Sequence, residues 1–237
     1  MAAGAGPPVS AGWAAVRARV EAACRRAGRS PAQVGLVAVS KGVSAARVRA
    51  VVAEGARDLG ENYVQEWQAK RDALGDLAVA WHFIGRIQRN KAAAVAGCAL
   101  AHSVADERVA RALAAAAAEQ GRPLRVLLQV NLGGEQSKAG LVPAELPRVL
   151  ESVRALPALR VEGLMAIPPP LDPEAVRPLF AALRELRDRQ VDPAALPHLS
   201  MGMSGDFEVA IEEGATLVRV GTAIFGPRPP KDDKEDA

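Results

Sequence analysis

The chain has 237 residues, 49% of them hydrophobic and 24% charged, and a formal net charge of +3 at pH 7. This suits one large α/β domain or two small ones and excludes a globally disordered chain; the charges alternate in sign, without the basic stripe typical of nucleic-acid binding. Two cysteines and three histidines, all scattered, together with the lack of a basic-apolar leader or a membrane-spanning run, favour a cytoplasmic protein without disulfides, zinc or a membrane anchor.

The N-terminal part of the chain holds one helix ahead of any strand. Residues 1–9 are small and rich in proline and glycine, so we expect a flexible N-terminus. Trp13, Val16 and Val20 then fall at helical spacing and predict an amphipathic helix over residues 10–28.

After this helix, a strand followed by a helix recurs about eight times. The predicted strands cover residues 36–40, 58–60, 81–85, 99–104, 124–130, 161–167, 198–201 and 216–220. The predicted helices between them cover residues 44–54, 64–74, 90–96, 106–120, 143–155, 173–190 and 206–213. The charged, proline-containing residues 229–237 predict a disordered tail.

This repeated order predicts a single (β/α)8 TIM barrel with an extra N-terminal helix. Each crossover between parallel strands must be right-handed, and about eight such strands close on themselves. An open doubly wound sheet is the main alternative. No change in composition marks a linker, so we assign residues 10–228 to one domain.

The most informative strand is the apolar run over residues 36–40, which ends abruptly in Lys41. The carboxyl end of a barrel strand is where this fold places its chemistry. Partial desolvation there favours the neutral amine, which is the nucleophile that forms a Schiff base with an aldehyde. Taken alone, Lys41 is better explained as a side chain that reaches solvent at a strand end.

Two later loops have the features of a phosphate site. Residues 201–206 form a glycine-rich turn with the Ser204 hydroxyl before a helix, and Gly221 and Thr222 follow the last strand. Free N–H groups at helix N-termini hold phosphate, and the loops after strands seven and eight are its usual place in a barrel. Either loop alone is more often an ordinary turn.

Arg219 lies between Val218 and Val220 in the last predicted strand. Since neighbouring side chains of a strand point to opposite faces, Arg219 is expected inside the barrel. An inward arginine requires an electronegative partner: a phosphate, a carboxylate, a pyridine nitrogen, or an acid in a structural salt bridge.

The polar or adaptable residues at the predicted strand ends therefore converge on one mouth of the barrel. They are Lys41, Asn62, His82, Asn131, Met165, Ser200, Ser204, Arg219 and Thr222.

The chain also carries long ordered motifs. They are Val39-Ser40-Lys41, Gly60-Glu61-Asn62-Tyr63-Val64-Gln65-Glu66, Trp81-His82-Phe83-Ile84-Gly85, Gly163-Leu164-Met165-Ala166-Ile167, Leu199-Ser200-Met201-Gly202-Met203-Ser204 and Val218-Arg219-Val220-Gly221-Thr222-Ala223-Ile224-Phe225-Gly226. Together these motifs closely resemble the pyridoxal phosphate homeostasis protein family, and the resemblance extends from the first helix to Gly226.

The resemblance implies a barrel like the N-terminal domain of alanine racemase, which carries pyridoxal 5′-phosphate (PLP) as an internal aldimine on Lys41. It implies a protein that buffers or delivers PLP, transiently meeting PLP-dependent apo-enzymes, and it favours a monomer. The implied cofactor-binding residues are Lys41, Asn62, His82, Met165, Ser200, Ser204, Arg219, Gly221 and Thr222. The basic segment 86–91 and Gly205 depart from the family pattern, and the roles of that segment and of Lys138 stay open.

An arginine on the pyridine nitrogen keeps that nitrogen unprotonated and weakens the cofactor as an electron sink. We therefore expect no clear catalytic turnover. A PLP-dependent racemase of low activity is the alternative, but racemisation needs two opposed bases. Tyr63 is expected to pack, and His82 is more simply a structural histidine. An aldolase-like barrel with an imine-forming lysine, and a role at RNA or membrane surfaces, are weaker alternatives.

Overall fold

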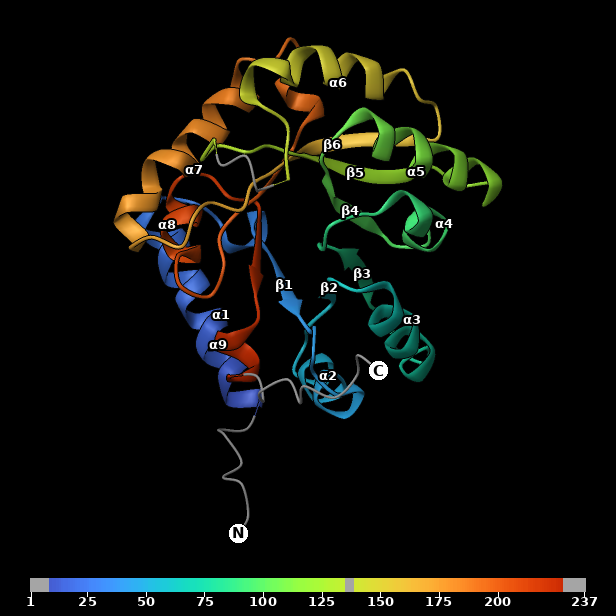
Figure 1. The fold of residues 1–237 in the computed structure, drawn as a ribbon. Coiled ribbons are helices and arrows are strands. Elements are labelled where there is room, and N and C mark those ends of the chain that lie inside the picture. Colours follow the sequence, from blue (N-terminus) through green and yellow to red (C-terminus); the bar gives the residue numbers. More distant parts are fainter. Residues whose placement is uncertain (1–8, 135–138, 228–237) are drawn as a thin grey trace, which may run out of the picture.

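The computed structural model describes residues 9–134 and 139–227. Its centre is a closed barrel of eight parallel strands in chain order, with β8 paired back to β1 (Figure 1). The strands are β1 (Gly35–Val39), β2 (Asp58–Glu61), β3 (Ala80–Phe83), β4 (Leu100–Val104), β5 (Leu124–Gln129), β6 (Leu159–Met165), β7 (His198–Ser200) and β8 (Leu217–Val220). The (β/α)8 barrel predicted from the sequence is confirmed, and the open sheet is excluded.

Helices surround the strands on the outside of the barrel (Figure 1). They are α1 (Val9–Arg26), α2 (Ala45–Ala53), α3 (Val64–Ala73), α4 (Ala92–Val95), α5 (Glu107–Glu119), α6 (Leu146–Arg154), α7 (Pro173–Asp188), α8 (Phe207–Glu212) and α9 (Thr222–Phe225). Short 3-10 turns lie at Pro31–Gln33, Arg89–Lys91, Pro143–Glu145 and Pro193–Ala195. Two of these turns open the helices predicted at residues 90–96 and 143–155, so α4 and α6 are shorter than expected.

The extra N-terminal helix α1 packs along α8 and α9 (Figure 1). Its apolar stripe of Trp13, Val16 and Val20 is buried, as the spacing predicts. The Trp13 indole N–H donates to the Glu54 carbonyl over 3.0 Å, which joins α1 to the end of α2. α1 thus covers the helices that follow β7 and β8, the two strands whose loops form one end of the cavity described below.

Successive side chains of the strands point alternately outward and inward, into two separate hydrophobic layers. The larger layer fills the space between strands and helices, and it takes Val218 and Val220 of β8. The smaller one fills the inside of the barrel with Val37, Leu100, Leu127, Met165 and Leu217. Arg219 is buried between the two valines in sequence, on the inner face, as the alternation predicts.

The observed strands begin and end within two residues of the predicted ones. The sheet register explains the largest shift, because β6 already pairs with β5 from Leu159 onward. Within the described residues, no helix is both long and apolar enough to span a membrane. The predictions for the N-terminus (residues 1–8), the tail at 229–237 and Lys138 concern positions outside the described residues.

Candidate functional site

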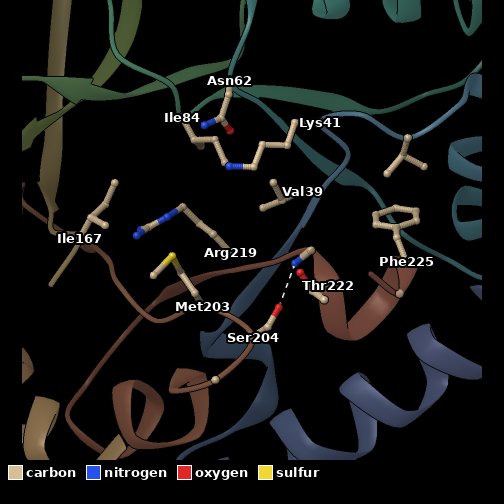
Figure 2. Close-up of a pocket in the computed structure, with 14 residues that line it drawn as sticks. Val39, Lys41, Asn62, Ile84, Ile167, Met203, Ser204, Arg219, Thr222 and Phe225 are labelled. Carbon is tan, nitrogen blue, oxygen red and sulfur yellow. Dashed lines mark hydrogen bonds between the residues drawn. The ribbon is translucent and has the colours of Figure 1, made fainter. Parts of the chain in front are cut away.

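A cavity of about 270 Å³ opens at the carboxyl ends of the strands. It is close to the lower limit of the roughly 300–1,000 Å³ typical of small-molecule sites. Apolar side chains, including those of Val39, Ile84, Ile167 and Met203, form much of its wall (Figure 2). Six of the nine predicted cofactor-binding residues line it, namely Lys41, Asn62, Ser204, Arg219, Gly221 and Thr222.

Lys41 lies two residues beyond the end of β1 and is partly buried. Its side chain extends across the cavity toward Asn62 and Ile84, and Arg219 enters from the side of Met203 (Figure 2). The Oδ1 atom of Asn62 is buried and accepts no hydrogen bond from any described residue. A buried acceptor without a partner is costly, so the site favours a ligand that brings a donor to this point.

An ion-pair cluster of Ser40, Glu61, Glu66 and Lys70 holds the backbone on both sides of Lys41. The Lys70 Nζ atom lies 2.5 Å from the Ser40 carbonyl oxygen, 2.6 Å from Glu61 Oε1 and 3.2 Å from Glu66 Oε2. Glu66 Oε2 also accepts from the Gly42 N–H over 2.7 Å, and Glu61 Oε1 accepts from the Ser40 hydroxyl over 2.6 Å. The peptide groups next to Lys41 are thus fixed by charged partners from β2 and α3.

Burial dominates the electrostatics of this cluster. The Glu61 side chain is fully buried, and that of Lys70 is 9% exposed. Burial raises the pKa of Glu61, while hydrogen bonds from Lys70 and Ser40 act in the opposite direction. Glu61 Oε2 has no described hydrogen-bond partner, so the carboxylate depends on its other oxygen for stabilisation.

Arg219 supplies a buried positive charge to the other side of the cavity. Its two terminal nitrogens donate to the Ser200 hydroxyl over 2.6 Å and to the Ala166 carbonyl over 2.9 Å. Among the described residues, no carboxylate forms an ion pair with it, so the alternative of a structural salt bridge finds no support. Burial lowers the pKa of Arg219 to about 10, which leaves it charged at neutral pH and electrostatically suited to an acceptor in the cavity.

The two glycine-containing loops form one structure. Ser204 Oγ accepts from the Gly221 N–H over 3.3 Å, which is the dashed line in Figure 2. It also accepts from the Ala223 N–H over 3.2 Å. A side chain at Gly221 would lie 3.2 Å from the Val39 carbonyl oxygen, so a larger residue would crowd β1. α8 starts only at Phe207, so Ser204 contacts the turn after β8 rather than opening a helix as the sequence suggested.

Three predicted site residues do not line the cavity. His82 and Ser200 are buried in the barrel, and Met165 belongs to its inner hydrophobic layer. Ser200 still contacts Arg219, which does line the cavity. Asn131, which was expected at the mouth of the barrel, does not line the cavity either. Tyr63 was expected to pack, but the residue is 52% exposed at the N-cap position of α3, where it lines a neighbouring cavity.

Several residues that support the site from behind cannot be assigned a role from the sequence alone. Glu61 and Glu66 belong to a motif that was noticed only for its resemblance, and Lys70 follows Glu66 by one helical turn. His102 lies in the middle of β4, and its Nδ1 atom is 2.8 Å from Ser200 Oγ. The spacing of one helical turn indicates the contact between Glu66 and Lys70. No local pattern indicates the contact between His102 and Ser200, because these residues are 98 positions apart in the sequence.

The arrangement combines three kinds of chemistry in one cavity. It presents an amine from Lys41, a buried guanidinium from Arg219, and a turn in which hydroxyls and backbone N–H groups gather around Ser204. An amine can bind a carbonyl carbon covalently, and the other two groups suit an electronegative ring atom and an anion.

Known proteins share both the sequence and the fold. A family model described as alanine racemase, N-terminal domain, matches residues 13–229. Pyridoxal phosphate homeostasis proteins of Pseudomonas aeruginosa and Aquifex aeolicus are 49% and 47% identical, over 91% and 89% of this chain and 94% of each relative. The structure of PipY from Synechococcus elongatus PCC7942, with PLP bound, matches with a TM-score of 0.79 at 37% identity, over 92% of this chain and all of PipY.

Proposed function

The chain belongs to the alanine racemase N-terminal-domain family and, within it, to the pyridoxal phosphate homeostasis proteins; from this premise we propose that it binds PLP in the mouth cavity and serves intracellular PLP homeostasis. The observation that carries the proposal is the meeting of Lys41, Arg219 and the Ser204 turn in one cavity. PLP presents an aldehyde, a pyridine nitrogen and a phosphate, which are the three partners that these groups suit.

We assign each part of PLP to residues of the cavity. The Lys41 amine would hold the aldehyde carbon covalently as a Schiff base, with the aldehyde oxygen leaving as water. Arg219 faces the pyridine nitrogen, while Ser204, Gly221 and Thr222 hold the phosphate. Asn62 Oδ1, buried without a described partner, meets a donor of the bound cofactor. His82, Met165 and Ser200 act from beneath the cavity rather than by direct contact.

The charges of the cavity support binding without catalytic turnover. Bound PLP supplies an electron-withdrawing ring, and that ring withdraws less when its nitrogen carries no proton. Arg219 opposes protonation there because two positive charges in contact repel each other. The site therefore holds the cofactor without strongly activating it.

The racemase alternative lacks a second base. Among the described residues that line the cavity, only Lys41 and Arg219 are titratable. Tyr63 and His82 do not line it. Racemisation requires proton transfer on both faces of the substrate, so we expect no solvent-deuterium exchange at Cα of any common amino acid. Deuterium exchange at Cα that is faster than the exchange catalysed by free PLP would support the racemase alternative.

The visible spectrum of the protein tests the binding and its lysine. We expect a yellow protein that loses its long-wavelength band on borohydride reduction, with the pyridoxyl mass on Lys41. Lys41→Ala should abolish the band, and the matched control Lys91→Ala should keep it. A wild-type protein that stays colourless with added PLP, or a label elsewhere than Lys41, contradicts the proposal.

We further propose a monomer that acts in the cytoplasm and passes PLP to apo-enzymes. The mouth supports release, because Ile167 lines the cavity and is 39% exposed. A loaded protein should reactivate a PLP-dependent apo-enzyme faster than the same concentration of free PLP, and light scattering should give the mass of one chain. Equal reactivation rates would limit the role to buffering.

A further inference from the structure

A chain of hydrogen bonds crosses the inside of the barrel and ends on Arg219. Its links are Asp58 Oδ1 to His82 Nε2 at 3.1 Å, His82 Nδ1 to His102 Nε2 at 2.8 Å, His102 Nδ1 to Ser200 Oγ at 2.8 Å, and Ser200 Oγ to Arg219 at 2.6 Å. We call Asp58, His82, His102 and Ser200 the histidine chain. All four links are of hydrogen-bonding length, so the path is continuous.

The histidine chain joins the two ends of the barrel. Asp58 is the first residue of β2, its side chain is 37% exposed, and it lines a cavity at the amino ends of β1 and β2. His102 of β4 and Ser200 of β7 are fully buried, and their strands are not neighbours in the sheet. Their contact therefore spans the interior and connects an accessible carboxylate to the guanidinium in the mouth.

The chemistry of the two ends fixes the direction of every hydrogen bond. Arg219 can only donate, so Ser200 Oγ accepts from it. Among the described residues, the acceptor for the Ser200 hydroxyl proton is His102 Nδ1, so a neutral His102 carries its own proton on Nε2 and donates it to His82 Nδ1. His82 then donates from Nε2 to the Asp58 carboxylate, which can only accept.

The reverse direction fails at both ends. A proton on His102 Nδ1 would donate to Ser200 Oγ, which already accepts from Arg219, and the Ser200 hydroxyl proton would then have no acceptor among the described residues. A neutral His82 would in that case turn a bare Nε2 toward the Asp58 carboxylate, which is repulsive. Burial, followed by the neighbouring His82 and the positive charge of Arg219, lowers the pKa of His102 well below its usual range, so a doubly protonated His102 is also disfavoured.

We propose that Asp58, acting through His82, His102 and Ser200, orients the Arg219 guanidinium and thereby the group that Arg219 contacts in the mouth. These four are positioning residues, since none of them lines the cavity. Through them, a carboxylate near the amino end of the barrel controls a contact at its carboxyl end. The ligand at that contact is PLP according to the proposed function, on which this part of the inference rests.

The first test needs no cofactor. In the apo-protein, nitrogen-15 NMR of the imidazoles should show the Nε2–H tautomer for both His82 and His102. Asp58→Ala removes the terminal acceptor and should mix the tautomers. Glu162→Ala is the matched control, because it removes another partly exposed barrel carboxylate, the partner of Arg125, without touching the histidine chain. An Nδ1–H tautomer at His102 in the wild type would overturn the proposal.

The second test uses the loaded protein. Asp58→Ala should weaken PLP binding about tenfold, as outer-shell changes commonly do, and should shift the visible band of the bound cofactor. Glu162→Ala should leave both unchanged. Mixed tautomers with an unchanged band and affinity would refute the positioning role. If Asp58→Ala does not fold, Asp58→Asn keeps the shape, removes the charge and should shift the band in the same direction.

The two tests separate this inference from the proposed function. A wild-type protein that binds no PLP contradicts the proposed function, and the tautomers of the apo-protein still decide whether the histidine chain has the inferred direction. Wild-type PLP binding with an Nδ1–H tautomer at His102 would preserve the proposed function and refute this inference.

Discussion

The cavity's two titratable residues are held by opposite kinds of chemistry. Behind Lys41, the ion-pair cluster places a lysine between two glutamates within 3.2 Å. Behind Arg219, the histidine chain offers a hydroxyl and two imidazoles before a carboxylate is reached. The first support places ionisable side chains directly against the backbone that it holds, and the second has its carboxylate only at the far end.

Their places in the barrel explain the difference. The ion-pair cluster lies between the strands and α3, and the helix itself contributes Glu66 and Lys70. In the described part of the chain the helices lie outside the barrel, so the polar groups of the histidine chain come from inward positions of the strands. Since a buried charge is costly without an adjacent partner, neutral groups that relay hydrogen bonds are the cheaper way to support Arg219.

The largest expected effect comes from removing the cation of the ion-pair cluster. Lys70→Met leaves Glu61 as a buried carboxylate without its counter-charge. Breaking one side of a buried ion pair costs about 3–5 kcal/mol. Urea unfolding followed by circular dichroism should therefore show a free energy of unfolding lower by about that amount, unlike the control Lys91→Met.

A double variant shows whether charge is the cause. Adding Glu61→Gln to Lys70→Met removes the orphaned charge and should recover a large part of the lost stability. If the effects of the two changes on the free energy of unfolding are simply additive, Lys70 stabilises the fold by packing rather than by pairing with Glu61. The support behind Lys41 would then not depend on charge, and it would no longer differ from the support behind Arg219 in this respect.

A smaller effect is expected from cutting the histidine chain. Ser200→Ala removes one partner of Arg219 and one of His102, but Arg219 keeps the Ala166 carbonyl. Buried groups left without a partner cost about 1–3 kcal/mol. Ser103→Ala is the matched control, since Ser103 is a buried serine of β4 that donates to the Gly85 carbonyl outside the chain. Unfolding should rank Lys70→Met above Ser200→Ala and Ser200→Ala above Ser103→Ala, and any other order contradicts the comparison.

The sequence predicted the barrel well because its strands are apolar runs bounded by turn residues, and local patterns set such boundaries. It also placed Lys41 and Arg219 at the mouth, because one ends a strand and the other alternates with two buried valines. Those positions depend on the period of a strand, which is visible in a few residues.

The depth of a residue inside the barrel could not be predicted in this way. His82 and Ser200 lie near strand ends and were placed at the mouth, yet the stagger of the strands leaves them beneath it. His102 was overlooked because its partner lies on a strand three places along the sheet. Such contacts arise from closure of the barrel, and no window of sequence contains both partners.

The smallest expected effect is the pH dependence that His102 of the histidine chain produces. The folded protein keeps His102 neutral because its pKa lies well below the usual 6.5, whereas the unfolded chain binds a proton as the pH falls through that value. The unfolded state then binds more protons, so stability decreases as the pH falls. Between pH 7 and pH 6 this amounts to about 0.7 kcal/mol for one histidine.

His102→Gln removes that titration and leaves the other histidines in place. The free energy of unfolding should therefore fall less steeply toward pH 6 in the variant than in the wild type. The ion-pair cluster predicts the opposite sign, because a raised pKa at Glu61 makes its contribution greatest below the ordinary value and reduces it as the pH rises. Equal slopes for wild type and variant would mean that His102 takes up protons between pH 7 and pH 6 in the folded protein as it does in the unfolded chain. The pKa of His102 would then not be lowered, and the neutral His102 on which the direction of the histidine chain depends would lose its support.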